Sequence, residues 1–104
     1  MTAEVRSVPS ADAQAEAADE WWRANRTSAP DLFVRELRAA TDLLAESPDI
    51  GQRVRHRAIR NLRRVLLPAT RYHVYYMHAP AGSEVLILSI WSAVRGRRPR
   101  LKIP

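Results

Sequence analysis

The chain has 104 residues, of which 46% are hydrophobic and none is cysteine, and its 17 basic and 11 acidic residues give a net charge of +6. This length and composition predict that residues 1–104 form one folded domain, and they exclude wholesale disorder, disulfides, thiolate metal sites and a cysteine nucleophile. No apolar run reaches the ~20 residues that span a bilayer and the N-terminus lacks a secretory signal, so we expect a cytoplasmic protein without membrane contact.

The charge is divided unequally between the two halves of the chain. Residues 1–52 carry five arginines and ten acids, a net of −5, whereas residues 53–104 carry eleven arginines, Lys102 and the single acid Glu84, a net of +11. Arginine binds phosphate and carboxylate through its planar fork and stacks on rings. The second half therefore predicts a surface for a polyanion, either nucleic acid or an acidic protein segment, with a merely solubilising basic face as the alternative.

The first half reads as a short strand followed by two helices. Residues 3–8 alternate weakly and contain two valines, which favours a strand. Residues 11–26 are rich in helix formers, with Ser10 as the expected N-cap. A second helix is expected after a cap at Ser28 and ends at the break SPDIG, residues 47–51. Residues at helical spacing form its apolar face: Phe33, Leu37, Ala40 and Leu44. The short connection predicts an antiparallel helical hairpin.

The second half reads as strands. Residues 53–60 are basic and fit either a loop or a ragged strand. NLRRVLL (61–67) and YHVYYMH (72–78) flank a proline-containing turn, which predicts two neighbouring strands. VLILSIW (85–91) is almost wholly apolar, as in a central strand, and a basic tail follows from about residue 92 to residue 104. The order β-α-α-β-β-β predicts an α+β fold in which the hairpin packs on an antiparallel sheet.

Strand alternation assigns side chains to the two faces of this sheet. The side chains expected to face the helices are those of Tyr72, Val74, Tyr76, Leu86, Leu88 and Ile90. The side chains expected on the open face are those of His73, Tyr75, Met77, Val85, Ile87, Ser89 and Trp91. Either Arg63 or Arg64 must also point outward, and the apolar count does not decide between them. Aromatic planes beside guanidinium groups hold single-stranded bases and phosphates, and they equally hold an extended peptide.

The ordered combination of these segments resembles the RelE/ParE superfamily of small bacterial toxins. It comprises the pattern A-x-x-x-x-A-x-x-W-W, a helix carrying LFVRELRAATDLL, the break SPDIG, the pair RRVLL and RYHVYY, and the strand VLILSIW followed by RGRRP, over roughly residues 3 to 99. Within the superfamily the chain is more similar to ParE-like or plasmid-stabilisation proteins than to RelE. The resemblance implies a toxin of a type II toxin–antitoxin module, silenced by a co-encoded antitoxin whose acidic, poorly ordered segment folds on it. Promoter DNA would be contacted only through that antitoxin.

The resemblance implies one of two targets. RelE-like members cut mRNA in the ribosomal A site, whereas ParE-like members poison DNA gyrase without a catalytic residue. A nuclease would have to rely on His73 with Arg64 or Arg63, because His73 stands where RelE-like relatives carry an arginine and the strand offers no lysine. These departures favour the gyrase target. An inactive relative that only binds its antitoxin and represses the operon is a third alternative.

Residues expected to contact the target or the antitoxin belong to the open face and the basic tail: Tyr75, Trp91, Arg95, Arg97 and Arg98. For His73 a surface histidine without a role is the plainer interpretation, and the same holds for His56 and His78. Three scattered histidines without acidic partners predict no metal site, and we expect no cofactor. Trp21 and Trp22 are expected to pack within the helical hairpin, with Trp22 facing inward.

Overall fold

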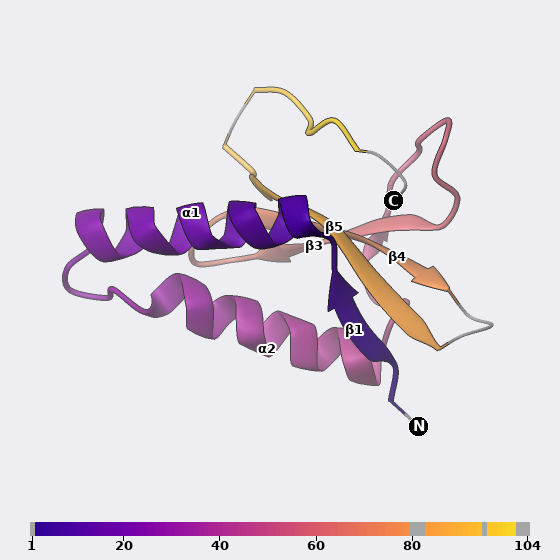
Figure 1. The fold of residues 1–104 in the computed structure, drawn as a ribbon, viewed down its shortest axis with the longest axis horizontal. Coiled ribbons are helices and arrows are strands. Elements are labelled where there is room, and N and C mark those ends of the chain that lie inside the picture. The colour runs from indigo at the N-terminus through magenta and orange to yellow at the C-terminus, as the bar shows by residue number, and fades with distance from the viewer. Residues whose placement is uncertain (1, 80–82, 95, 102–104) are drawn as a thin grey trace.

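A computed structural model of the chain describes residues 2–79, 83–94 and 96–101 (Figure 1). The elements in chain order are strand β1 (Glu4–Ser7), helices α1 (Pro9–Asn25) and α2 (Leu32–Glu46), and strands β2 (Gln52–Arg53), β3 (Leu62–Leu67), β4 (Tyr72–Ala79) and β5 (Glu84–Ser92). The strands form one five-stranded sheet in the order β1-β5-β4-β3-β2. The predicted α+β fold is thus confirmed, and the ambiguous basic stretch contributes only the short edge strand β2.

The sheet is mixed rather than wholly antiparallel. Each of the strands β2 to β5 pairs antiparallel with the next one along the chain. Strand β1 lies beside β5 and runs parallel to it, with Glu4 opposite Glu84 and Ser7 opposite Ile87. The prediction of an antiparallel sheet is therefore wrong for this one pair. Its direction depends on where the helical hairpin returns the chain, which strand patterning does not encode.

Both helices begin at residues other than the predicted ones. Helix α1 starts at Pro9, which needs no N–H partner in a first turn, and Val8 rather than Ser10 stands at the N-cap. Helix α2 starts after Asp31 rather than after a cap at Ser28. The predicted apolar face of α2 is confirmed, because Phe33 and Leu44 are buried and the other two members pack on the same core. Figure 1 shows the two helices side by side as the expected hairpin.

Apolar side chains pack on both faces of the sheet. The larger core lies between the helices and the sheet and includes Phe33, Leu44, Leu67, Val74, Tyr76, Val85, Ile87 and Ile90. A smaller core on the other face contains Ile59, Leu62, Tyr75 and Leu88, with Leu101 packed against it. The face predicted to be open is therefore partly covered, by the segment that follows β2 and by the end of the chain.

A bulge between β4 and β5 changes the expected alternation. Tyr75 pairs with Ser89 but Tyr76 pairs with Ile87, so Leu88 is the extra residue. On the N-terminal side of the bulge, Val85 and Ile87 face the helices while Leu86 and Leu88 pack on the other face, the reverse of the prediction. Beyond it Ile90 and Trp91 lie on their predicted faces. Strict alternation fails from Val85 to Leu88 because the extra residue in β5 moves the side chains on that side of the bulge to the opposite face of the sheet.

The placement of Ser89 on the open face is also wrong. Ser89 is buried, and its hydroxyl donates a hydrogen bond of 3.1 Å to the side-chain carbonyl of Gln14 in α1. The same oxygen accepts a 2.8 Å bond from the backbone N–H of Ile90. Gln14 thereby ties α1 to β5 at the bulge, where ladder pairing is interrupted.

Candidate functional site

A hollow of about 160 Å³ on the face away from the helices is lined by most of the side chains that the sequence singles out. They are Arg64, His73, Tyr75, Trp91, Arg97 and Arg98, with Ser92, Ala93 and Gly96 completing the wall. Arg95 lies outside the described residues. The structure thus brings together residues from three strands and the C-terminal segment that are far apart in the sequence.

Strand register places these side chains next to one another. Arg64 of β3 stands opposite Tyr75 of β4, and His73 of β4 stands opposite Trp91 of β5. Facing residues on neighbouring strands have their side chains within contact distance. Three central strands therefore form the floor of the hollow, and the chain after β5 forms its rim.

Arg64 and Tyr75 form the polar centre of the hollow. The Arg64 Nη1 donates a hydrogen bond of 3.2 Å to the Tyr75 hydroxyl, and its guanidinium carbon lies 5.9 Å from the Tyr75 ring centre. The His73 ring lies 6.0 Å from the Tyr75 ring in an edge-on arrangement. Tyr75 faces the predicted side but is only 2% exposed, since the smaller core covers it. The prediction that its ring is an exposed contact surface is therefore wrong.

Trp91 is held against the C-terminal segment. Its indole Nε1 donates a hydrogen bond of 3.0 Å to the Arg97 backbone carbonyl, and the Arg97 guanidinium lies 5.7 Å from the ring centre. These contacts fold the chain after β5 back over the sheet. Arg97 and Arg98 are thereby brought to the rim of the hollow, which explains how a basic tail adds to a site built on strands.

The electrostatics of the hollow are cationic. Among the described residues no acidic side chain lines it. Burial lowers the pKa of His73, and the nearby charges of Arg64 and Arg71 lower it further. His73 is therefore neutral at pH 7 and is able to accept a proton, but it has no carboxylate in the hollow to orient it.

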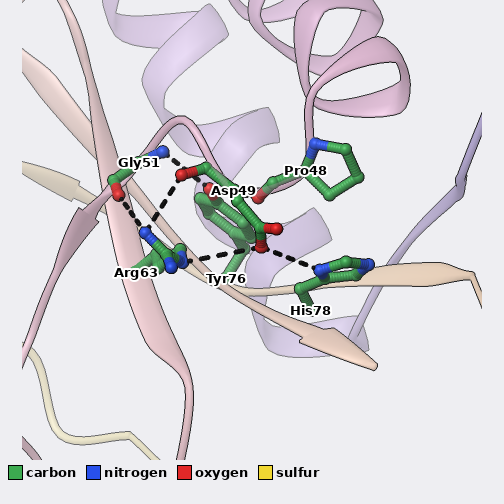
Figure 2. Close-up of polar contacts among 6 residues, drawn as sticks. All are labelled: Pro48, Asp49, Gly51, Arg63, Tyr76 and His78. Carbon is green, nitrogen blue, oxygen red and sulfur yellow. Dashed lines mark hydrogen bonds and ion pairs between the residues drawn. The ribbon is translucent and has the colours of Figure 1, made fainter. Parts of the chain in front are cut away.

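Arg63 and Arg64 point to opposite faces, which resolves the ambiguity left by the sequence. Arg63 turns toward the loop after α2, where its Nη1 donates hydrogen bonds of 2.8 Å to the Gly51 carbonyl and 3.0 Å to the Asp49 carbonyl (Figure 2). Its Nε also lies 3.8 Å from the Asp49 carboxylate. Only Arg64 therefore reaches the hollow.

The same loop is anchored by a buried tyrosine that the sequence marks only as a core residue. The Tyr76 hydroxyl donates a 2.6 Å hydrogen bond to the Pro48 carbonyl and accepts a 2.9 Å bond from the Gly51 N–H (Figure 2). His78 adds a 2.9 Å contact between its Nδ1 and Asp49 Oδ1. Burial raises the pKa of Tyr76, so this hydroxyl is a structural hydrogen-bonding group.

The turn before β4 is fixed by Glu36 of α2. Its carboxylate accepts hydrogen bonds from the Ala69 N–H (2.7 Å), the Thr70 N–H (2.9 Å) and the Thr70 hydroxyl (2.6 Å). Burial raises the pKa of Glu36, but the bonds from Thr70 and Ala69 outweigh it, so the pKa lies below its ordinary value. This contact sets the start of β4 and therefore the position of His73.

The part of the chain that the structure describes contains neither a metal-binding group of side chains nor a membrane-spanning helix. Within residues 2–79, 83–94 and 96–101, no group of three or more His, Asp or Glu side chains is arranged to hold a metal ion. Within the same ranges, none of the helices has the length and apolar character needed to cross a membrane.

The family of the chain follows from its match to known sequences. Residues 5–96 match the family described as "ParE toxin of type II toxin-antitoxin system, parDE". The chain belongs to this ParE toxin family. No curated protein sequence matches the chain. The predicted resemblance to the RelE/ParE superfamily is thus confirmed, and within that superfamily the matching family is ParE.

Solved structures share the fold of this ParE-family chain. One is described as a chromosomal ParDE TA system from P. aeruginosa, with a TM-score of 0.65 and 16% identity, over 88% of this chain and 96% of that one. Another is a mutant of the E. coli toxin RelE in the free state, with a TM-score of 0.54 and 18% identity, over 90% of this chain and 86% of that one. At these identities the likeness supports the fold alone.

Proposed function

We propose that this ParE-family toxin arrests growth by acting on DNA gyrase and not by cutting mRNA. The family is that of toxins from type II toxin–antitoxin systems, and one similar structure is of a ParDE system. A toxin that works by binding a protein needs a surface of cations and aromatic rings, but no set of proton-transfer groups. The hollow on the sheet fits that requirement.

The observation that carries this proposal is the position of Arg63. A ribonuclease of the related kind needs cations on the strand to stabilise charge on the phosphate, together with groups that move protons. Arg63 is bound to the carbonyls of Asp49 and Gly51 on the opposite face, so β3 presents Arg64 alone. The remaining proton-transfer candidate, His73, has no acidic neighbour among the described residues that line the hollow.

A ribosome-dependent mRNA endonuclease is the second candidate, and one observation favours it. His73 and Arg64 line the same hollow, and the lowered pKa of His73 keeps its ring neutral and able to accept the proton of a ribose 2′-OH. Arg64, Arg97 and Arg98 would then neutralise the scissile phosphate. This candidate makes His73 indispensable, whereas action on gyrase does not.

We further propose that the toxin is neutralised by a ParD-type antitoxin that docks on an apolar groove between α2 and β3. The groove, of about 290 Å³, is lined by two exposed apolar side chains, Leu43 and Ile50, which are 52% and 47% exposed. Beside it, β2 pairs with Arg63 and Arg64, and no described residue pairs as a strand with the outer edge of β3 from residue 65 to 67. An antitoxin segment can pack apolar anchors in the groove and pair with that edge.

Purified components test the target directly. The toxin is added to gyrase holoenzyme with relaxed plasmid and ATP, and supercoiling and DNA cleavage are followed on gels. We expect inhibition or accumulated cleaved DNA, and its reversal by the antitoxin. The His73→Ala variant should behave as the unaltered toxin does. Unimpaired supercoiling at all toxin concentrations, with growth arrest in cells, would refute the gyrase target.

A further inference from the structure

A second concave surface lies at the end of the sheet nearest the hairpin tip, outside the hollow described above. This cleft of about 620 Å³ is lined by Trp21, Trp22, Arg26, Ala69, Thr70, Arg71, Tyr72, Ser92 and Val94. An adjoining hollow of about 320 Å³ shares Trp21, Tyr72 and Ser92 with it and extends to Trp91. Ser92, the last residue of β5, lines all three depressions, so the cleft continues the candidate site around the end of the sheet.

The two tryptophans that close α1 have different environments. Trp22 packs against the larger core, as predicted, whereas Trp21 is 46% exposed. Packing within the hairpin therefore accounts for Trp22 but not for Trp21. Val94, across the cleft, is 76% exposed. Large apolar groups left in water on both walls of a cleft indicate a contact surface.

The cations of the cleft have no acidic partners among the residues that the structure describes. Arg23, one turn earlier on α1, pairs with Asp19 at 3.1 Å, but neither Arg26 nor Arg71 forms an ion pair within the described residues. Arg71 is exposed and sits at a φ of 64°, in the left-handed region, which fixes where its side chain leaves the turn. Two unpaired guanidinium groups beside two indoles attract an anionic ligand.

The geometry of the rings favours an acidic peptide over a nucleic acid. The Arg26 guanidinium lies 5.0 Å from the Trp21 ring centre and 5.6 Å from that of Trp22, and the two rings meet edge-on at 69°. A base stacks on a free ring face, and here Arg26 already covers one. A carboxylate can bind Arg26 from its outer side without displacing it, while an apolar side chain contacts Trp21.

We propose that this cleft binds an acidic segment of the toxin's protein target, with one apolar side chain seated between Trp21 and Val94 and carboxylates on Arg26 and Arg71. The volume falls within the ~300–1,000 Å³ of ligand sites, and Trp, Tyr and Arg are the residue types that dominate binding energy in protein interfaces. This inference rests on the proposed action on a protein, but not on that protein being gyrase.

Growth arrest without antitoxin is the first readout. Arg26→Glu and Trp21→Ala should each raise the toxin level needed for arrest by about tenfold or more, as loss of an interface anchor does. Arg38→Glu, an exposed site on α2 with the same charge change, is the matched control and should leave it unchanged. Trp21→Phe keeps an apolar ring and should lose little. Unaltered thermal unfolding and antitoxin binding of Arg26→Glu show that its fold is intact.

A photocrosslinking amino acid at position 94 identifies what occupies the cleft in poisoned cells. We expect one protein adduct that disappears in Arg26→Glu; a gyrase subunit would support both proposals, and another protein would support the cleft while refuting gyrase. The inference is overturned by an adduct to nucleic acid, by an adduct that persists in Arg26→Glu, or by full toxicity of Arg26→Glu. An Arg26→Glu toxin that remains active but escapes the antitoxin would also overturn it.

Discussion

Arg63 and Arg64, adjacent in β3, make their hydrogen bonds on opposite sides of the sheet. Arg64 donates to the Tyr75 hydroxyl in the hollow, and Arg63 donates to the Gly51 and Asp49 carbonyls beneath the loop after α2. A structural role is thereby separated from a surface role in two neighbouring residues of the same type. The two positions accordingly make a matched pair for mutation.

Arg63→Ala should lower the free energy of unfolding, since the partly buried bond to the Gly51 carbonyl and the exposed bond to the Asp49 carbonyl are both lost. We expect a loss of about 1–3 kcal/mol, measured by urea unfolding. Arg64→Ala should cost less stability, because it removes only two long bonds to side chains, 3.2 Å to the Tyr75 hydroxyl and 3.4 Å to Gln52 Oε1, while weakening growth arrest. Equal stability losses for the two variants would contradict this division of roles.

Substitutions at Gly51 and Tyr76 should destabilise the protein without touching the hollow. A Cβ at Gly51 would lie 2.6 Å from the Tyr76 hydroxyl and 3.0 Å from the Arg64 carbonyl, so Gly51→Ala should cost about 1–3 kcal/mol by overpacking. Tyr76→Phe leaves the Gly51 N–H and Pro48 carbonyl unpaired and should cost about as much. Thermal unfolding of each variant provides the measurement, and a Tyr76→Phe midpoint equal to that of the unaltered chain would refute the anchor.

The Glu36 carboxylate should make the free energy of unfolding depend on pH, with lower stability in acid. Its pKa is lower in the folded protein than in the unfolded chain, so its contribution is present above the unfolded pKa of about 4.3. That contribution is lost as pH falls through the folded pKa. Glu36→Gln should therefore be less stable than the unaltered chain at pH 7, with the difference shrinking at low pH. Urea unfolding at several pH values measures it, and a difference independent of pH would contradict the assignment.

His73 should change stability in the same direction as Glu36 but at higher pH, because a lowered histidine pKa means that the folded protein disfavours the charged ring. Its effect is absent above the unfolded pKa of about 6.5, and stability falls as pH drops below that value. NMR titration of the ring should give a pKa below 6.5. Arg64→Leu should raise that pKa part of the way back, since burial remains. An unchanged pKa in Arg64→Leu would show that Arg64 does not act on His73.

The antitoxin groove and the target cleft predict opposite phenotypes. Leu43→Ser and Ile50→Ser should leave growth arrest intact but weaken neutralisation, because they remove apolar anchors of the groove. Arg26→Glu should weaken growth arrest but leave neutralisation intact. Growth assays with and without the antitoxin, and titration calorimetry of the purified pair, measure both effects. Normal antitoxin affinity in Leu43→Ser would refute the groove.

Patterns confined to one element were readable from the sequence. The spacing from Phe33 to Leu44 gave the buried face of α2 because a helix has a fixed period, and the aromatic strand showed which side Tyr76 and His73 occupy. The order of elements and the basic second half led to the correct superfamily. These features depend on local geometry, which the chain carries with it.

Features that depend on distant segments were not readable. The bulge at Leu88 exchanged the faces of β5, and the parallel pairing of β1 depends on the path of the hairpin. The choice between Arg63 and Arg64 is settled by the loop at Gly51, a neighbour only in the fold. Burial of Tyr75 comes from Ile59, in a stretch whose pattern was ambiguous.

Induction of the toxin in cells lacking the antitoxin, followed by separate assays of the chromosome and of mRNA, distinguishes action on gyrase from cleavage of mRNA. Action on gyrase should give double-strand DNA breaks and an SOS response, mRNA without cuts inside codons, and the same outcome for His73→Ala. Intact chromosomes together with mRNA cut within codons, and loss of toxicity in His73→Ala, would contradict it.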